Sequence, residues 1–233
     1  MKGLFEGVRH MPVSHRISIG AEPAPYDVLI GSGLLYSSGD LMREELGLNS
    51  GRVAVVSSGA VADLYMPSAV QSMIRAGFEV TPVIIPDAEE GKRLAVIKGI
   101  YDRLAACGFT RNDTVVALGG GSISDAAGFA AATYMRGIRL VNIPTTLLSQ
   151  ADSSIGGKTA VNIDAGKNLV GAFHNPSLVI EDEDVLDTLP KRQFASGVAE
   201  IIKYACVADA RMFLKLVAVK RPNASIIAQC ARI

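Results

Sequence analysis

Cysteine and histidine are scarce in this sequence, which narrows the kinds of site that it can build. Only three residues of each type occur among the 233. Cys107, Cys206 and Cys230 are far apart and form no CxxC pair, so we predict free thiols in a reducing cytosol. The histidines show no metal-ligand spacing, and the least ordinary of them is His174, which follows a Gly-Ala-Phe turn.

The sequence also has no excess of basic over acidic residues, or of acidic over basic ones. Lys+Arg and Asp+Glu both number 23, so the net charge is close to zero. A neutral chain gives no electrostatic reason to expect nucleic acid or an anionic membrane as a partner. No stretch reaches the ~18 consecutive apolar residues of a membrane helix, and residues 1–15 lack the apolar run of a signal peptide. We therefore expect a soluble, cytoplasmic protein.

Strand and helix patterns alternate along most of the chain. Hydrophobic residues make up 49% of it, enough for a sizeable core. Short β-branched runs predict strands at 26–30, 52–57, 79–85, 113–118 and 139–143. Helical spacing of apolar residues predicts helices at 60–75, 94–104 and 124–135. This alternation implies an α/β fold, with a Rossmann-like parallel sheet covered on both faces.

The secondary-structure preference of the sequence changes near Asp187. From there the residues are nearly all helix-forming, with a break at Pro222. We predict an α/β domain over residues 1–186 and the start of an all-helical domain over 187–233. Because a helical domain of this size is small for a stable core, we expect a chain that is truncated at its C-terminal end.

A run of three glycines follows one predicted strand and precedes a predicted helix. Gly119, Gly120 and Gly121 lack Cβ atoms, so their backbone amides could approach a phosphate at a helix N-terminus. The spacing is not GxGxxG, and a tight turn that needs positive φ angles is the alternative explanation. The position between strand and helix favours a dinucleotide diphosphate.

Residues 144–159 form an unusually long stretch without a regular pattern. It follows a strand, where open α/β sheets bind ligands, and it is rich in hydroxyls and glycines. It also carries Asp152 and Lys158, and Lys167 adds a second cation nearby. Sixteen irregular residues are uncommon in a compact domain, so we predict a binding loop, although solvated side chains would also explain its polarity.

A carboxylate and an ammonium share one face of a predicted helix. Glu200 and Lys203 are three residues apart among apolar neighbours. A simple ion pair explains this spacing, and a metal ligand is the functional alternative.

Read together, four segments resemble the 3-dehydroquinate synthases. They are GGGSISDAAGFAAATYMRG, IPTTLLSQADSSIGGKTAVN, GKNLVGAFHNP and GVAEIIKY, in the order and at the intervals of that family. The resemblance runs from about Tyr26 to the end of the chain, and DSSIGGKTAVN is quite specific. It implies an NAD-binding domain followed by the start of a helical domain that binds metal and substrate.

The resemblance also implies roles for individual residues. Those implied for NAD are Glu89, Lys92, Gly119, Gly120, Gly121, Ser122, Asp125, Thr145, Thr146, Leu148, Asp152, Lys158, Lys167 and Thr188. Those implied for the substrate's hydroxyl, carboxylate and phosphate groups are Asp152, Lys158, Asn168 and Lys203. Glu200 would be one of three ligands to zinc or cobalt. Arg136 would reach into the site of a neighbouring subunit, which implies a homodimer.

The activity implied is the conversion of 3-deoxy-D-arabino-heptulosonate 7-phosphate to 3-dehydroquinate and phosphate, in the shikimate pathway. NAD would remove a hydride from the sugar phosphate and return it, while the protein mainly positions the reactants. The alternatives are a fragment that binds NAD without turnover, half of a split enzyme, and another sugar-phosphate cyclase.

The sequence departs from the family pattern in three ways. Family members continue well beyond Ile233 and carry two histidine metal ligands there, so we expect this chain alone to be inactive. Ser58 stands where the family usually has an acidic or amide residue for the adenosine ribose, which puts that contact in doubt. Ser122 and Ser124 replace commoner residues in the glycine segment, where the backbone would make the contact.

Overall fold

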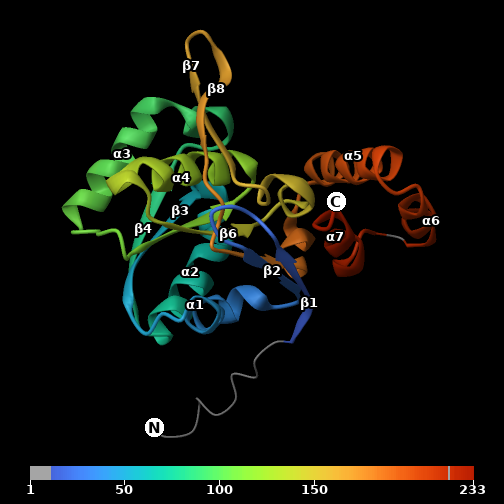
Figure 1. Ribbon diagram of the computed structural model, residues 1–233, viewed down its shortest axis with the longest axis horizontal. Coiled ribbons are helices and arrows are strands. Elements are labelled where there is room, and N and C mark those ends of the chain that lie inside the picture. Colours follow the sequence, from blue (N-terminus) through green and yellow to red (C-terminus); the bar gives the residue numbers. More distant parts are fainter. Residues whose placement is uncertain (1–11, 220) are drawn as a thin grey trace, which may run out of the picture.

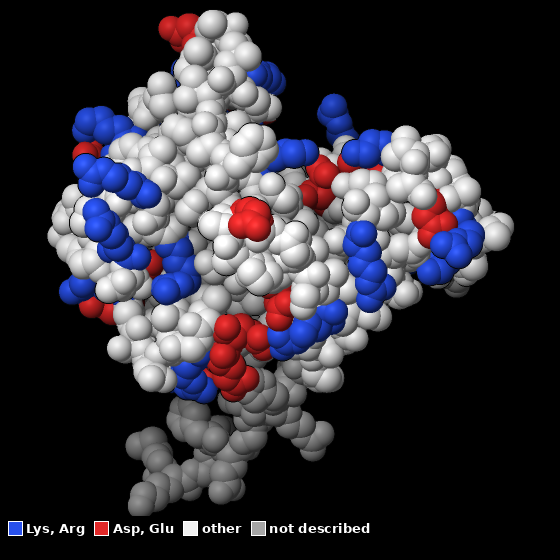
Figure 2. Space-filling model, viewed as in Figure 1, with Lys and Arg blue, Asp and Glu red and all other residues white. Residues whose placement is uncertain are grey.

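A computed structural model describes residues 12–219 and 221–233, and Figure 1 shows a sheet flanked by helices, a projecting hairpin and a helical group at one end. The first eleven residues, which include most of the segment tested for a signal peptide, lie outside the described part. Within that part, no helix has the length and apolar character needed to cross a membrane. Figure 2 shows acidic and basic side chains interspersed over the face in view.

The main sheet has seven strands in the order β1-β2-β9-β6-β5-β3-β4. They are β1 (Val13–Ile19), β2 (Tyr26–Gly31), β3 (Gly51–Ser58), β4 (Phe78–Ile85), β5 (Thr114–Gly119), β6 (Arg139–Pro144) and β9 (Leu178–Asp182). The edge strand β1 is antiparallel to β2, and the other neighbours are parallel. The predicted parallel α/β architecture is confirmed.

Helices cover both faces of this sheet. They are α1 (Ser38–Leu46), α2 (Gly59–Arg75), α3 (Leu94–Ala106) and α4 (Gly121–Thr133). On β3, Val53 and Val55 pack with α1 and α2, whereas Ala54 and Val56 pack with α3 and α4. In Figure 1 the first helix pair lies below the sheet and the second above it. Because both faces are buried, the strands appear in the sequence as continuous apolar runs.

The order of the strands creates a crevice between β3 and β5. The chain adds β4 outside β3 and then returns to place β5 on the other side of β3. The connections from these two strands therefore leave in opposite directions, which is where open α/β sheets bind ligands. β3 ends at Ser58 and β5 ends at Gly119, so the glycine run lies beside this crevice.

Several elements differ from the sequence prediction. Strands β1 and β9 and helix α1 were not predicted, and α4 begins at Gly121 rather than Ser124. The same helix ends at Thr133 because Met135, with φ 52°, and Arg136, with φ 66°, adopt left-handed conformations. These backbone angles are not visible in a run of good helix formers.

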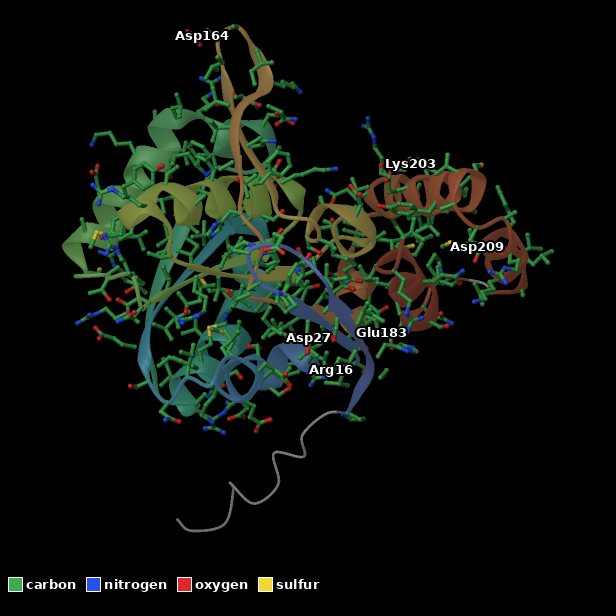
Figure 3. The ribbon with its side chains drawn as sticks, in the orientation of Figure 1. Arg16, Asp27, Asp164, Glu183, Lys203 and Asp209 are labelled. Carbon is green, nitrogen blue, oxygen red and sulfur yellow. The ribbon has the colours of Figure 1, made fainter. Side chains whose placement is uncertain are left out.

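The stretch predicted to be irregular is shorter than expected and leads into a hairpin. Residues Ser149–Ser153 form a π-helical turn, and Lys158 begins β7. β7 (Lys158–Ile163) pairs antiparallel with β8 (Gly166–Phe173) in a separate two-stranded sheet. This hairpin projects from the molecule in Figure 1, with Asp164 at its tip in Figure 3. Most of β8 is exposed, so it lacks the alternation that predicts a half-buried strand.

Three helices lie in the C-terminal segment that the sequence predicts to be mostly helical. They are α5 (Lys191–Val207), α6 (Arg211–Ala218) and α7 (Ala224–Cys230), and the predicted break at Pro222 falls between the last two. Ile201 of α5 and Ile227 of α7 share a hydrophobic cluster with Val28 and Val179 of the sheet. The helical group therefore packs directly on the sheet, and the boundary at residue 187 stays a prediction.

Candidate active site

The bend from β5 into α4 is formed by the three glycines. None of them has a positive φ angle, so the alternative of a left-handed turn is wrong. Glycine is required by close packing instead. A Cβ atom on Gly119 would lie 2.6 Å from Ile123 Cγ1, and one on Gly121 would lie 2.8 Å from Ser153 Oγ. The bend thus presents bare backbone at the start of a 13-residue helix, where the helix dipole favours an anion.

The residues that follow β6 pack against this bend. The Thr145 amide donates to the Gly119 carbonyl at 3.0 Å, and the Thr146 methyl would lie 3.0 Å from a Cβ atom on Gly120. The hydroxyls of Thr145 and Ser153 are buried and have no hydrogen-bond partner among the described residues. Because buried hydroxyls are normally paired, both have unused capacity for a bound group beside the bend.

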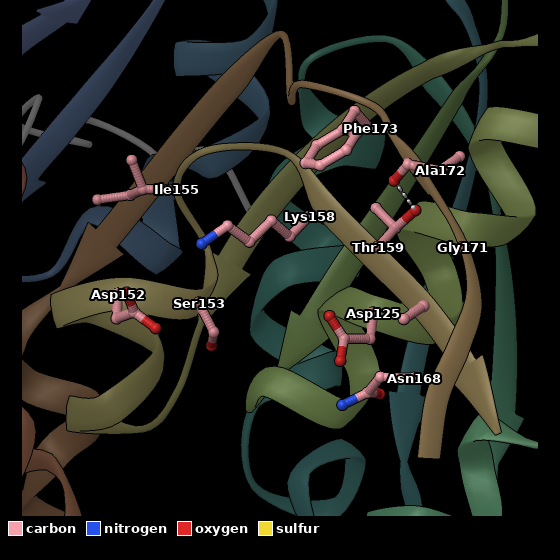
Figure 4. A pocket seen from close by; sticks show the side chains of 11 residues that line it. Asp125, Asp152, Ser153, Ile155, Lys158, Thr159, Asn168, Gly171, Ala172 and Phe173 are labelled. Atoms are coloured by element: carbon pink, nitrogen blue, oxygen red, sulfur yellow. Dashed lines mark hydrogen bonds between the residues drawn. The ribbon is translucent and has the colours of Figure 1, made fainter. Parts of the chain in front are cut away.

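A cavity of about 450 Å³ opens between α4, the π-helical turn and the hairpin. Asp125, Asp152, Lys158 and Asn168 all line it, and Figure 4 shows them around a shared space. In that view Asp125 and Asn168 lie together on one side, while the Lys158 ammonium points toward the side that carries Asp152. The structure thus brings together four of the predicted site residues from three separate segments.

Lys158 is the cation of this cavity that is free to bind a ligand. Its side chain is exposed, and its ammonium forms no ion pair or hydrogen bond with any residue in the described part of the chain. An ammonium is a compact point charge suited to a phosphate or a carboxylate. The cavity can therefore hold an anionic group on Lys158 and hydroxyl groups on the two carboxylates.

A buried lysine ties two walls of the cavity together. Lys92 is 3% exposed, and its ammonium donates to Asp125 at 2.5 Å and to the Asn168 side-chain oxygen. Burial raises the pKa of Asp125, while the Lys92 ammonium acts in the opposite direction. Asn168 has a φ of 56°, which an asparagine adopts more readily than most residues. These contacts hold the hairpin against the first turns of α4.

The opposite wall is held by α5. Tyr204 Oη donates to Asp152 Oδ1 at 2.7 Å, and burial, reinforced by this carboxylate, raises the pKa of the Tyr204 phenol. Lys203 contacts Glu200, which raises the pKa of the Lys203 ammonium, and its Nζ lies 4.7 Å from the centre of the Tyr204 ring. In Figure 3 Lys203 rises from the upper side of α5. Asp152 is therefore fixed by a tyrosine that the sequence prediction did not include.

The residues present do not complete a metal centre. Glu200 was the one predicted ligand, and its carboxylate is paired with Lys203. Within residues 12–219 and 221–233, no group of three or more His, Cys, Asp or Glu side chains is arranged to hold a metal ion. A single paired carboxylate does not satisfy the four ligands of a typical zinc site.

The geometry agrees with what comparisons with known proteins show. A family model described as 3-dehydroquinate synthase N-terminal matches residues 82–196. A 3-dehydroquinate synthase of Citrifermentans bemidjiense is 50% identical over 201 residues, which are 86% of this chain and 55% of that relative. The chain belongs to the 3-dehydroquinate synthase family. It spans about half the length of the curated relatives that it matches.

Solved structures of related cyclases have the same fold. The 2-epi-5-epi-valiolone synthase of Streptomyces hygroscopicus, with NAD+ and Zn2+ bound, matches with a TM-score of 0.79 and 31% identity over 94% of this chain and 62% of that one. A 2-deoxy-scyllo-inosose synthase complexed with carbaglucose-6-phosphate, NAD+ and Co2+ matches with a TM-score of 0.74 and 30% identity over 81% of this chain and 51% of that one.

Two predicted residues of this family member lie beside a second hollow, next to the turn of the hairpin. Lys167 Nζ is 3.7 Å from Glu89, and Asn162 Nδ2 donates to the same carboxylate at 2.5 Å. The Asn162 hydrogen bond, followed by the charge of Lys167, lowers the pKa of Glu89. Glu89 and Lys167 thus extend the site from the cavity toward the carboxyl end of β4.

Other predicted residues are not brought into the cavity. Arg136 is exposed just after α4, and Thr188 contacts the Tyr65 hydroxyl on α2. Leu148 is 37% exposed, and Ser122 lies in the first turn of α4. The four residues are therefore placed around the site or away from it, and their roles stay predictions.

Sequence reasoning missed Tyr204 and Asn162. Tyr204 follows Glu200 by four positions, so helical spacing places both on one face, and that signal was available. Asn162 lies on β7, and its contacts depend on a hairpin that the sequence does not reveal.

Proposed function

We propose that this chain forms the NAD-binding part and part of the substrate site of a 3-dehydroquinate synthase. The reaction is the conversion of 3-deoxy-D-arabino-heptulosonate 7-phosphate to 3-dehydroquinate and phosphate. The observation that carries the proposal is the cavity in which an unpaired Lys158 faces Asp152, Asp125 and Asn168. A sugar phosphate has the anionic and hydroxyl groups that such a set of side chains binds.

NAD fits the residues around the glycine bend. Backbone amides at the start of α4 would bind the diphosphate, and the unpaired hydroxyls of Thr145 and Ser153 lie beside that position. Asp125 and Lys92 would orient the cofactor from the cavity side. When bound, NAD supplies the acceptor and donor of a hydride, and the work of these residues is to orient it and exclude water.

The proposed substrate-binding residues lie on the hairpin, the π-helical turn and α5. Lys158 and Lys203 would hold anionic groups, and Asp152 and Asn168 would hold hydroxyls. Because Tyr204 donates to Asp152, this carboxylate is fixed before the substrate arrives, which lowers the cost of ordering it. Glu200 would contribute to a zinc or cobalt site in an assembly that supplies further ligands.

Three further proposals concern the oligomeric state, the cellular compartment and the identity of the substrate. We propose a homodimer in which the exposed Arg136 reaches the partner's site. Three unpaired cysteines are compatible with a reducing cytoplasm. A second candidate, a cyclase acting on a different sugar phosphate, is favoured by the fold match to the inosose and valiolone synthases.

Calorimetry with NAD present tests the substrate site. Heptulosonate 7-phosphate should bind wild type at least tenfold more tightly than Lys158→Ala, because the ammonium has no partner to release. Lys98→Ala, which removes an exposed lysine of α3, is the matched control and should bind as wild type does. Equal affinities of the two variants would show that Lys158 does not bind this ligand. Tighter binding of carbaglucose-6-phosphate would favour the second candidate.

Turnover by the isolated chain is a separate test. We expect the 233-residue chain to bind NAD and to release no phosphate from heptulosonate 7-phosphate with zinc or cobalt present, because the described residues provide no complete metal site. Phosphate release above the no-enzyme rate would show that this account of the ligands is wrong.

A further inference from the structure

Glu181 is a buried acid that the proposed chemistry does not use. It lies on β9 inside the main sheet and is 0% exposed. Ser154 Oγ lies 3.4 Å from its Oε1, a long contact, and its Oε2 has no hydrogen-bond partner among the described residues. Burial raises the pKa of Glu181 well above the usual value. An ionised carboxylate without a cation or a set of donors is very costly in such a place, so burial favours the neutral acid.

A second unpaired atom lies on the neighbouring strand. Asn142 of β6 is in register with Val179 of β9, and residues two apart on a strand share a face. The side chains of Asn142 and Glu181 therefore project from the same face of the sheet. Asn142 Nδ2 donates to the Ser154 carbonyl at 2.9 Å, but its Oδ1 is buried and receives no hydrogen bond from the part of the chain that the structure describes. A neutral carboxyl carries one O–H donor, which is the group that Asn142 Oδ1 lacks.

Ser154 connects these two side chains to the cavity. It is 1% exposed, and its amide donates to the Ser149 carbonyl at 3.0 Å, which closes the π-helical turn. Asp152 belongs to this turn, and its carbonyl accepts from the Ile155 amide at 3.0 Å. The place of Asp152 in the cavity thus depends on where Ser154 is held.

We propose that Glu181, as a neutral carboxylic acid, is a positioning residue that holds Ser154 and thereby the turn that presents Asp152 to the cavity. The role of Asp152 rests on the proposed function, but the anchoring of the turn does not.

Among the described residues, Tyr26 of β2 and Cys230 of α7 are the titratable groups on other elements whose pKa responds to the charge of Glu181. Burial raises the pKa of Tyr26 and raises that of Cys230 to about 12, so neither contributes a charge near neutral pH. Neither group therefore offers a cation that would stabilise an ionised Glu181.

Infrared spectroscopy tests the protonation state directly. Neutral carboxyl groups absorb apart from carboxylates, so the difference spectrum between wild type and Glu181→Gln at pH 7 should show one protonated-carboxyl band lost from wild type. A difference confined to the carboxylate bands would overturn the proposal.

Amide hydrogen exchange tests the positioning. In Glu181→Leu, the amides of Ser154, Ile155 and Gly156 should exchange at least tenfold faster than in wild type, with Val115 and Val116 of β5 unchanged. Glu181→Gln, which keeps a neutral donor of the same shape, should stay within twofold of wild type. Ser154→Ala removes the same contact from the other side and should lose protection at Ile155 and Gly156 even if the leucine variant fails to fold. Wild-type protection in Ser154→Ala would overturn the proposal.

These measurements need neither NAD nor substrate, so their result is independent of the proposed function. Binding of heptulosonate 7-phosphate then provides the functional readout, with at least a tenfold loss expected in Glu181→Leu and less than twofold in Glu181→Gln. If wild type itself does not bind this ligand, the proposed function fails while the exchange result still decides the role of Glu181.

Discussion

Removing the ammonium of Lys92 should lower the free energy of unfolding, and the size of the loss measures how strongly the cavity wall depends on one buried ion pair. The Lys92 side chain is 4% exposed and the Asp125 side chain is 23% exposed, so water screens this pair poorly. In Lys92→Met the Asp125 carboxylate loses its cation, and Asn168 loses a donor as well. Breaking a buried pair on one side typically costs 3–5 kcal/mol, and the partial exposure of Asp125 places our expectation near the lower end, at about 3 kcal/mol at pH 8.

The cost should depend on pH with a definite sign. Burial raises the pKa of Asp125 above 3.8, and without Lys92 nothing opposes that shift. The folded variant then holds its proton to higher pH than the unfolded chain, so its stability falls as the pH rises from about 4. Lys92→Met should therefore be close to wild type at pH 4 and most destabilised at pH 8.

Urea unfolding at pH 4, 6 and 8 measures this effect. Lys98→Met is the matched control, because it removes a lysine from an exposed pair whose side chains are 74% and 64% exposed. Its cost should stay below about 0.5 kcal/mol at every pH. If the two variants lose the same free energy of unfolding at pH 8, the Lys92–Asp125 pair does not hold the cavity wall and the reasoning is wrong.

Two further predictions concern the cofactor and the buried acid. Gly120→Val should abolish NAD binding in a fluorescence titration, because a Cβ atom there already meets Thr146 at 3.0 Å, whereas Gly99→Val, at a site with nothing within 4 Å, should bind as wild type does. Unchanged affinity for NAD in Gly120→Val would show that the glycine bend does not bind the diphosphate. Because the folded pKa of Glu181 is raised, wild-type stability should fall as the pH rises above about 4.5, the unfolded value. Glu181→Gln should lack this pH dependence, so its free energy of unfolding should rise relative to that of wild type by up to about 1.4 kcal/mol per pH unit. Urea unfolding of both proteins at several pH values measures this difference. A difference that does not change with pH would contradict a neutral Glu181.

The sheet could be predicted from the sequence because its strands are buried on both faces. The predicted strands at 52–57 and 113–118 contain the continuous apolar runs 53–56 and 115–118, and the glycine run between strand and helix marks the crevice. The hairpin could not be predicted, since most side chains of β8 are exposed and carry no periodic signal. The strand β9 is short and contains the acids Glu181 and Asp182, so its burial is invisible without its neighbours.

The candidate site was predictable in its residue types and less so in its contacts. Asp152 and Lys158 stand out in a polar stretch after a strand, and they do line one cavity. The ion pair of Lys92 with Asp125 joins residues 33 positions apart, and the hydrogen bond from Lys92 to Asn168 spans 76. Such contacts depend on the path of the hairpin over α4, which no local pattern encodes.

The projecting hairpin has a consequence for how the site responds to its ligands. A two-stranded ribbon is barely stable by itself, and here its position depends on contacts with neighbouring elements, including the Lys92 contact with Asn168. Lys158 and Asn168 both belong to this ribbon, so a molecule that bridges them to Asp125 adds to the contacts that already hold the ribbon against α4. Ligand binding in the cavity and ordering of the ribbon are then coupled. A ligand that binds the cavity should order the ribbon, and a change that orders the ribbon should strengthen ligand binding.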